Sequence, residues 1–257
     1  MVLEPLPALS DNYIWMLHAG QRAVVVDPGE AGPVLDALQA RGLQLETILV
    51  THHHHDHTGG VPALRAATGC RVVGPAREAV PEPAERVTGG DTVDTLGLRF
   101  SVIDVPGHTA GHIAFFCAAG AGDPVLFCGD TLFFGGCGRL FEGTPAQMLA
   151  SLDALAALPG ATRVCCGHEY TLSNLAFGRA VEPANAALAA ASDRCAALRA
   201  AGQPTLPSTI ALEREINPFL RSRLPAVAEA VSRHASLPST DEAGIFAALR
   251  QWKNEFR

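Results

Sequence analysis

Short runs of β-forming residues alternate with helical patterns through the first part of the chain, and this alternation limits the fold more than any other feature. The β-forming runs are short, apolar and rich in β-branched residues, whereas the segments between them carry apolar residues at helical spacing. The order is strand, helix, strand, helix, strand over Ala23–Val26, Val34–Arg41, Ile48–Thr51, Val61–Thr68 and Arg71–Val73. Such an order is typical of a layered α/β fold, in which helices cover a sheet.

The same alternation continues to about residue 170. We expect further strands at Leu98–Val105, His112–Cys117, Val125–Cys128 and Arg163–Cys166, with a helix over Pro145–Leu158 between the last two. The strands run into loops rich in glycine, aspartate or histidine, the first of which reads Asp-Pro-Gly from Asp27. Loops at strand ends collect functional side chains in layered α/β proteins, so we expect the functional site there.

The pattern changes near Tyr170, where the strands stop. The chain becomes rich in alanine and helical from about Ser173 to Ala201, breaks at Gly202–Pro207, and then continues as helices. We therefore expect a catalytic domain at residues 1–170 and an α-helical substrate-binding domain at residues 171–257. No Ser/Gly linker separates them, so we expect them to pack directly on one another.

Composition and charge exclude several classes of protein. A content of 48% hydrophobic and 18% charged residues is typical of a globular chain and not of a disordered one. The formal net charge of −7 disfavours nucleic acid and anionic membranes as partners. The sequence has no apolar run long enough for a transmembrane helix, and Met1–Leu9 does not resemble a secretory signal. With seven cysteines, an odd number, we expect a cytoplasmic protein with reduced, mostly buried thiols.

The strongest chemical motif is Thr51–His57, which reads Thr-His-His-His-His-Asp-His and follows an expected strand. Because successive side chains of an extended chain point to opposite sides, His52 and His54 project to the same side and can bind one metal ion. Asp56 and His57 follow after a turn and could bind a second ion, since imidazole and carboxylate suit zinc, iron or manganese. The alternatives are a histidine-rich surface loop or a cloning tag, but a tag lies at a terminus and lacks the aspartate.

Three further candidate ligands follow expected strands. His108 lies in a Pro-Gly-His-Thr segment, Asp130 in Gly-Asp-Thr-Leu, and His168 in Cys-Gly-His-Glu-Tyr. Any one of them alone would more often be a structural loop residue. A dinuclear metal site needs about seven nitrogen and oxygen ligands from scattered loops, and these three complete that number together with the histidine-rich motif.

The ligand motifs in this order resemble the metallo-β-lactamase superfamily, and within it the glyoxalase II family, the hydroxyacylglutathione hydrolases. The closer resemblance also rests on the segments Gly136–Thr144, Cys166–Thr171, Asn217–Phe219 and Arg250–Lys253. These motifs are spread over nearly the whole chain. Their collinear order is far more specific than any single motif.

The resemblance implies an α/β fold, an αββα metallo-β-lactamase-like sandwich followed by a C-terminal helical domain. It also implies two divalent metal ions at the sandwich edge, zinc first, with iron or manganese as alternatives. By this resemblance the first ion is held by His52, His54 and His108, the second by Asp56, His57 and His168, and Asp130 bridges both. His53, His55 and His112 are then not ligands.

The implied reaction is hydrolysis of the thioester S-D-lactoylglutathione to D-lactate and glutathione, the second step of methylglyoxal detoxification. Two cations about 3.5–4 Å apart can lower the pKa of a shared water toward about 7. A metal-bridging hydroxide then attacks the thioester carbonyl, with Asp56 and Asp130 as the catalytic residues. No side-chain nucleophile is required, and the sequence contains neither a Gly-x-Ser-x-Gly elbow nor a complete His-Glu-x-x-His motif.

Glutathione carries two carboxylates, so an acidic protein must supply cations locally. Arg250 and Lys253, the only lysine of the chain, are three residues apart and share a face if helical. The resemblance assigns them to the glycine carboxylate, and assigns Tyr170 to the substrate backbone. Arg139 and Phe141 depart from the family, which often has lysine and tyrosine there. Phe141 has no hydroxyl, so we expect a weaker or altered grip on glutathione.

Other functions remain as alternatives. The first is a glutathione persulfide dioxygenase on the same scaffold, with iron as its metal. A phosphodiesterase or tRNA-processing nuclease is disfavoured by the negative charge, and a β-lactamase by the absence of a secretory signal. The last is a non-enzymatic metal store. We expect a monomer that takes a small-molecule glutathione thioester and binds neither nucleic acid nor membranes.

Overall fold

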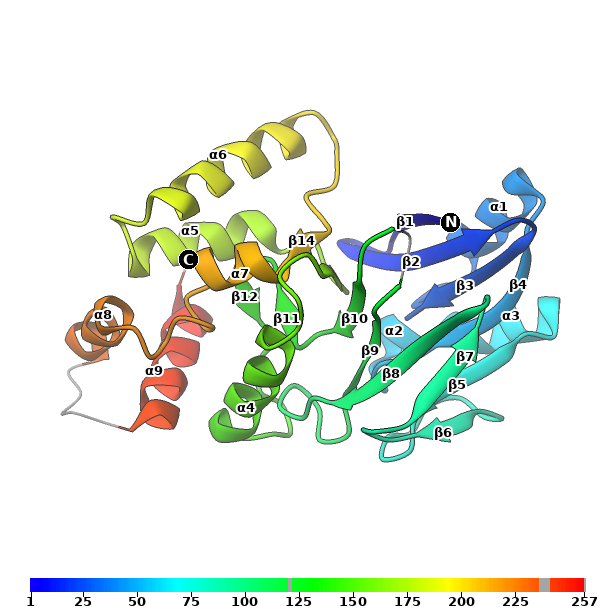
Figure 1. Ribbon diagram of the computed structural model, residues 1–257, viewed down its shortest axis with the longest axis horizontal. Coiled ribbons are helices and arrows are strands. Elements are labelled where there is room, and N and C mark those ends of the chain that lie inside the picture. Colours follow the sequence, from blue (N-terminus) through cyan, green and yellow to red (C-terminus); the bar gives the residue numbers. More distant parts are fainter. Residues whose placement is uncertain (120–121, 236–240, 257) are drawn as a thin grey trace.

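A computed structural model describes residues 1–119, 122–235 and 241–256. Two six-stranded sheets pack face to face with helices outside them, and further helices gather at one end of the sandwich (Figure 1). This is the αββα sandwich followed by a C-terminal helical region that the resemblance implies.

The first sheet contains the N-terminal strands in sequence order. They are β1 (Val2–Ala8), β2 (Asn12–Ala19), β3 (Arg22–Val26), β4 (Gln44–Leu49), β5 (Arg71–Pro75) and β6 (Glu85–Val87). The pairs from β3 to β6 are parallel, so the carboxyl ends of these strands meet at one edge. The connecting helices are α1 (Gly32–Arg41), α2 (His55–Thr58) and α3 (Val61–Thr68).

The second sheet contains strands from the middle and the late part of the chain. Its order is β14 (Ser208–Thr209), β13 (Arg163–Cys166), β10 (Val125–Gly129), β9 (Ile113–Cys117), β8 (Leu98–Asp104) and β7 (Thr92–Thr95). A small hairpin of β11 (Leu132–Phe133) and β12 (Gly136–Cys137) follows β10, and α4 (Pro145–Ala156) precedes β13. A Thr144–Gln147 capping box fixes the start of α4.

The remaining helices follow residue 170. They are α5 (Thr171–Val181), α6 (Ala186–Ala200), α7 (Ile210–Ile216), α8 (Pro225–Ala235) and α9 (Glu242–Glu255). Helix α9 lies against α4 and α8 (Figure 1). Among the described residues, no helix combines the length and the apolarity that crossing a membrane requires.

Alternation along β2 shows how the sequence builds the layers. Tyr13, Trp15 and Leu17 belong to the core between the two sheets, whereas Ile14 and Met16 pack under the outer helices. Both faces of this strand are therefore buried, as expected for a sheet covered by helices on one side and by a second sheet on the other. Full burial of a side chain of this size contributes about 1.5–3 kcal/mol.

One expectation about the C-terminal part is wrong. The chain returns to the second sheet after residue 170, because Ser208 and Thr209 form β14 and pair with Val164 and Arg163 of β13. A two-residue strand carries no periodicity that a sequence could reveal. The helices pack directly on the sandwich and share its core, and the division of the chain near residue 170 stays a prediction.

Candidate metal centre

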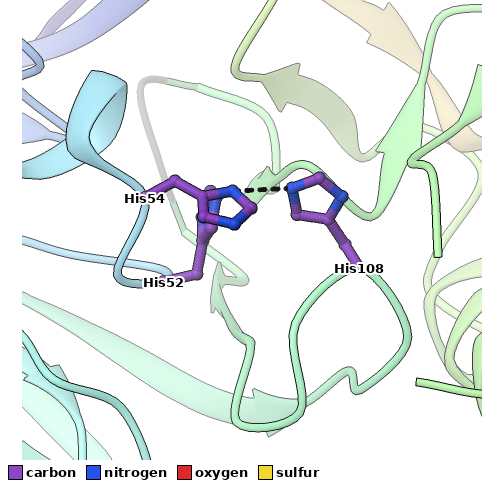
Figure 2. A group of neighbouring side chains, drawn as sticks. All are labelled: His52, His54 and His108. Carbon is purple, nitrogen blue, oxygen red and sulfur yellow. Dashed lines mark hydrogen bonds between the residues drawn. The ribbon is translucent and has the colours of Figure 1, made fainter. Parts of the chain in front are cut away.

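Three histidines meet at the edge of the sandwich. His52 and His54 lie in the loop after β4, and His108 lies in the loop between β8 and β9. Figure 2 shows their rings turned toward one another. The Nδ1 atom of His54 lies 3.2 Å from Nε2 of His52 and 3.0 Å from Nε2 of His108. Three imidazole nitrogens so close together can bind one metal ion.

A second group lies beside the first. Asp56 and His57 are on the short helix α2, and His168 follows β13. The Nε2 atoms of His57 and His168 are 3.3 Å apart, and Oδ2 of Asp56 is 3.4 Å from each of them. This group offers two imidazoles and one carboxylate, again a donor set suited to a divalent cation.

Asp130 lies between the two groups. Its Oδ2 is 3.3 Å from Nε2 of His108 and 3.4 Å from Nε2 of His168. Its Oδ1 is buried, faces Nε2 of His57 at 3.4 Å, and has no hydrogen-bond partner among the described residues. A buried carboxylate oxygen without a hydrogen bond is costly, and a bound cation would satisfy it. The donors therefore fit divalent metal ions.

The electrostatics of the first group favour neutral imidazoles. Burial is the main cause that lowers the pKa of His52, His54 and His108, and it lowers that of His52 far below the ordinary value. Neutral imidazole is the form that binds metal, because protonation occupies the lone pair.

In the second group, the carboxylates determine the protonation of the histidines. Hydrogen bonds from His168 and His57 hold the pKa of Asp56 far below its usual range. Burial opposes ionisation of Asp130, but His57 and His168 still lower its pKa. Burial also opposes protonation of these two histidines, yet the carboxylates raise the pKa of His168 to about 10 and that of His57 well above its ordinary value. This pocket attracts positive charge, and a metal ion would have to displace the two protons.

Further groups that the sequence analysis did not assign orient the imidazoles. Asp27 accepts hydrogen bonds at 2.7 Å from the backbone N and the hydroxyl of Thr51, and lies 3.2 Å from Nδ1 of His57. Asp11 lies 2.8 Å from Nδ1 of His168, and the carbonyl of Arg139 lies 2.9 Å from Nδ1 of His108. Such partners fix the ring orientation of a ligand histidine. The Asp-Pro-Gly turn was the only sequence signal for any of them.

The histidines predicted not to be ligands have other partners. His112 stacks on His52 with ring centroids 4.5 Å apart, and its Nε2 accepts from the backbone N of Asp130 at 3.1 Å. Burial lowers the pKa of His112 to about 3, which keeps it neutral. His53 turns toward Glu78, and His55 is exposed.

One cavity of about 550 Å³ brings the metal-site and substrate-site candidates together. The metal-site side chains that reach it are His54, Asp56, His108, Asp130 and His168. The five predicted substrate-binding residues line the same cavity: Arg139, Phe141, Tyr170, Arg250 and Lys253.

The substrate-binding candidates differ in how firmly they are held. Arg250 is buried, donates to the carbonyl of Cys137 at 2.7 Å, and lies over the ring of Phe219. Lys253 donates to the hydroxyl of Ser173 at 2.9 Å. Two cations of α9 thus line the same cavity as the histidine-rich loop.

The two aromatic candidates lie against candidate metal ligands. Tyr170 stacks on His168 with ring centroids 4.6 Å apart. Phe141 is 62% exposed, and its ring lies 5.7 Å from that of His54 and 5.2 Å from that of His108. Because Phe141 also lines the cavity, its exposed ring can contact a molecule bound there.

Comparisons with known proteins agree with this geometry. A family model described as "Metallo-beta-lactamase superfamily" matches residues 9–168, and one described as "Hydroxyacylglutathione hydrolase C-terminus" matches residues 169–256. A protein of Albidiferax ferrireducens named hydroxyacylglutathione hydrolase is 68% identical over 256 residues, which cover 100% of each chain.

Two solved structures are similar over much of the chain. The crystal structure of ETHE1 from Myxococcus xanthus is 26% identical, with a TM-score of 0.67 over 98% of this chain and 97% of that one. The crystal structure of TTHA1623 in a di-iron-bound form is 34% identical, with a TM-score of 0.54 over 65% of this chain and 92% of that one.

Proposed function

This chain belongs to the hydroxyacylglutathione hydrolase family of the metallo-beta-lactamase superfamily, and from that premise we propose that the two donor groups and the adjoining cavity form its active site. The enzyme is a glyoxalase II, which hydrolyses S-D-lactoylglutathione to D-lactate and glutathione in the second step of methylglyoxal detoxification. The observation that carries the site assignment is the position of Asp130, which touches both donor groups within a cavity that Arg250 and Lys253 also line.

The proposed metal ligands divide into two sets that share Asp130. His52, His54 and His108 hold the first ion, and Asp56, His57 and His168 hold the second. Two divalent ions bound there would make hydroxide available at neutral pH and polarise the thioester carbonyl. We propose zinc, with iron or manganese as alternatives, and the di-iron-bound form of TTHA1623 shows that a related fold accepts iron.

The chain's own residues then bind and orient the substrate. Arg250 and Lys253 face the cavity as cations and would hold a carboxylate of glutathione, while Arg139 adds a third positive charge. Burial and nearby carboxylates raise the pKa of Tyr170, so its hydroxyl stays protonated and can donate to the substrate backbone. Thiolate is a good leaving group, so no side chain has to act as a general acid.

We also propose that the protein is a cytoplasmic monomer without nucleic-acid or membrane partners. All seven cysteines, each in the described part of the chain, are buried and unpaired, which suits a reducing compartment. The net charge of −7 supports the absence of polyanionic partners.

The site and reaction are tested together by following the thioester absorbance of S-D-lactoylglutathione. We expect rapid loss with metal-replete protein and no loss after a chelator has removed the metal. Protein shown to hold two metal ions that leaves the thioester intact would contradict the proposal. Oxygen uptake with glutathione persulfide in that same sample would favour the dioxygenase alternative.

The pH dependence of substrate binding tests the role of Lys253. Burial, then Arg250 and Arg139, lower the pKa of Lys253 to about 8, so the side chain loses its charge as the pH rises through that value. Only the protonated fraction can pair with a carboxylate, and we therefore expect KM to rise by up to about tenfold between pH 7 and pH 9.

The matched variant is Lys253→Arg, which keeps its charge throughout this pH range. Its KM is expected to change much less between pH 7 and pH 9, whereas kcat should follow the same pH profile in both proteins. Parallel KM profiles in the two proteins would exclude Lys253 as a carboxylate-binding residue.

A further inference from the structure

A buried carboxylate lies behind the first group of histidines. Glu78, in the loop after β5, has a side chain that is only 1% exposed. Its Oε2 accepts from the backbone N of His53 at 2.6 Å and lies 2.6 Å from Nδ1 of the same residue. Its Oε1 accepts from the backbone N of Gly111 at 3.0 Å. Each carboxylate oxygen thus binds a different loop.

These two loops carry the whole first group of candidate ligands. His53 stands between His52 and His54 in the sequence, and Gly111 is three residues after His108. A single carboxylate therefore joins the two backbone segments whose separation sets the distances among the three imidazoles.

The loop that carries His108 and Gly111 packs so closely on the Glu78 loop that a side chain at Gly111 would not fit. A Cβ at Gly111 would lie 2.7 Å from Cγ of Glu78 and 2.8 Å from Cβ of Arg77. The Glu78 loop is itself fixed, because Arg86 donates from Nη1 to the carbonyls of Glu78 at 2.7 Å and Pro75 at 3.1 Å. Arg86 thus ties the Glu78 loop to β6, the edge strand of the first sheet.

A second carboxylate supports the same junction from the outside. Glu142 accepts from the backbone N of Ala110 at 2.7 Å and lies 3.5 Å from Nε2 of His53. The donors of His53, Glu78 and Glu142 lie close enough to resemble a further metal site. Both oxygens of Glu78, however, already accept backbone N–H groups, which favours a structural clamp over a ligand.

We propose that Glu78 is a positioning residue, which fixes the loop of His52 and His54 relative to the loop of His108 and so arranges the first metal-binding group before metal arrives. This inference rests on the proposed metal ligands and extends them to a residue that touches none of them. Preorganised ligands bind metal more tightly because less conformational freedom is lost on binding.

The test is a zinc titration of metal-free protein against a chromophoric chelator, which gives a dissociation constant for each ion. We expect Glu78→Ala to weaken one of the two constants by about 10–100-fold and to leave the other unchanged. Glu78→Gln keeps one acceptor oxygen, so we expect a smaller loss at the same ion. The control is Glu85→Gln, an exposed carboxylate paired with Arg71, and we expect it to match the wild type.

Amide hydrogen exchange of the metal-free proteins gives a second readout. The N–H of Gly111 is expected to exchange slowly in the wild type and faster in Glu78→Gln, while amides in the core of β10 (Val125–Gly129) keep their protection. If Glu78→Ala does not fold, Glu78→Gln alone still tests the proposal.

Three outcomes would contradict the role of Glu78 as a positioning residue. The zinc dissociation constants could be unchanged in both Glu78 variants, or both ions could bind equally more weakly in a protein whose Tm is also lower. The third outcome is a third zinc ion that the wild type binds and Glu78→Ala does not. A wild-type protein that binds fewer than two zinc ions would instead contradict the proposed metal centre. The titration of the wild type alone therefore tests the metal centre separately from the role of Glu78.

Discussion

Asp130→Asn is expected to abolish binding of two metal ions and to lower turnover of S-D-lactoylglutathione by well over 100-fold. Asp130 is the side chain that contacts both donor groups, through Oδ2 to His108 and His168 and through Oδ1 to His57. Asparagine fits the space but is neutral and offers one oxygen. Residues that only support a metal ligand cost about 10–100-fold when replaced, so a larger loss distinguishes a ligand from a supporting residue.

The measurement combines metal analysis of the purified protein with the thioester assay. Asp36→Asn makes the same chemical change at an exposed position of α1 and is expected to match the wild type in both. An Asp130→Asn protein that retained two metal ions and normal turnover would exclude Asp130 as the bridging residue.

Gly167→Ala is expected to have the second largest effect, although glycine contributes no functional group. A Cβ at this position would lie 2.6 Å from Cε1 of His57 and 2.7 Å from Oδ1 of Asp130. Neither side chain can retreat, since both are buried among the other candidate ligands. Overpacking of this kind costs about 1–3 kcal/mol of the free energy of unfolding. Displacing catalytic groups by about 1 Å lowers turnover by about 100-fold.

Gly32→Ala is the matched control, because a Cβ there would meet nothing within 4 Å. Metal content, turnover and Tm are measured for both proteins. We expect Gly167→Ala to lose metal and turnover far beyond what its lower Tm explains, and Gly32→Ala to lose neither. Normal metal content in Gly167→Ala would show that the site has more room than these distances indicate.

The parts of the fold that follow from local pattern were predictable. The strands β3, β4, β5, β8, β9, β10 and β13 and the helices α1, α3 and α4 were expected within a few residues, because each carries a clear local pattern. The strands β2 and β7, which also contribute to the core, were not expected. The candidate site could also be located, since its side chains follow directly after strands whose ends meet at one edge. Their roles as ligands stay a prediction.

The features that the sequence did not reveal depend on contacts between residues that are far apart in the chain. Strand β1 contains Pro5 and Pro7, which argue against a strand until its place at the edge of the sheet is known. Asp11 and Glu78 look like ordinary surface acids in the sequence. Only the folded chain shows that one reaches His168 and that the other joins two loops.

The spacing of the two donor groups along the chain has a consequence for how the protein is made. His54 and His108 are 54 residues apart, whereas His57 and His168 are 111 apart, and Asp11 contacts His168 across 157 residues. Contacts between residues so far apart in the sequence form late in folding, because a long loop must close first. During synthesis on the ribosome, the first group of histidines can therefore assemble well before the second group. The second group needs His168, which is in place only after β13 has emerged and packed on β10.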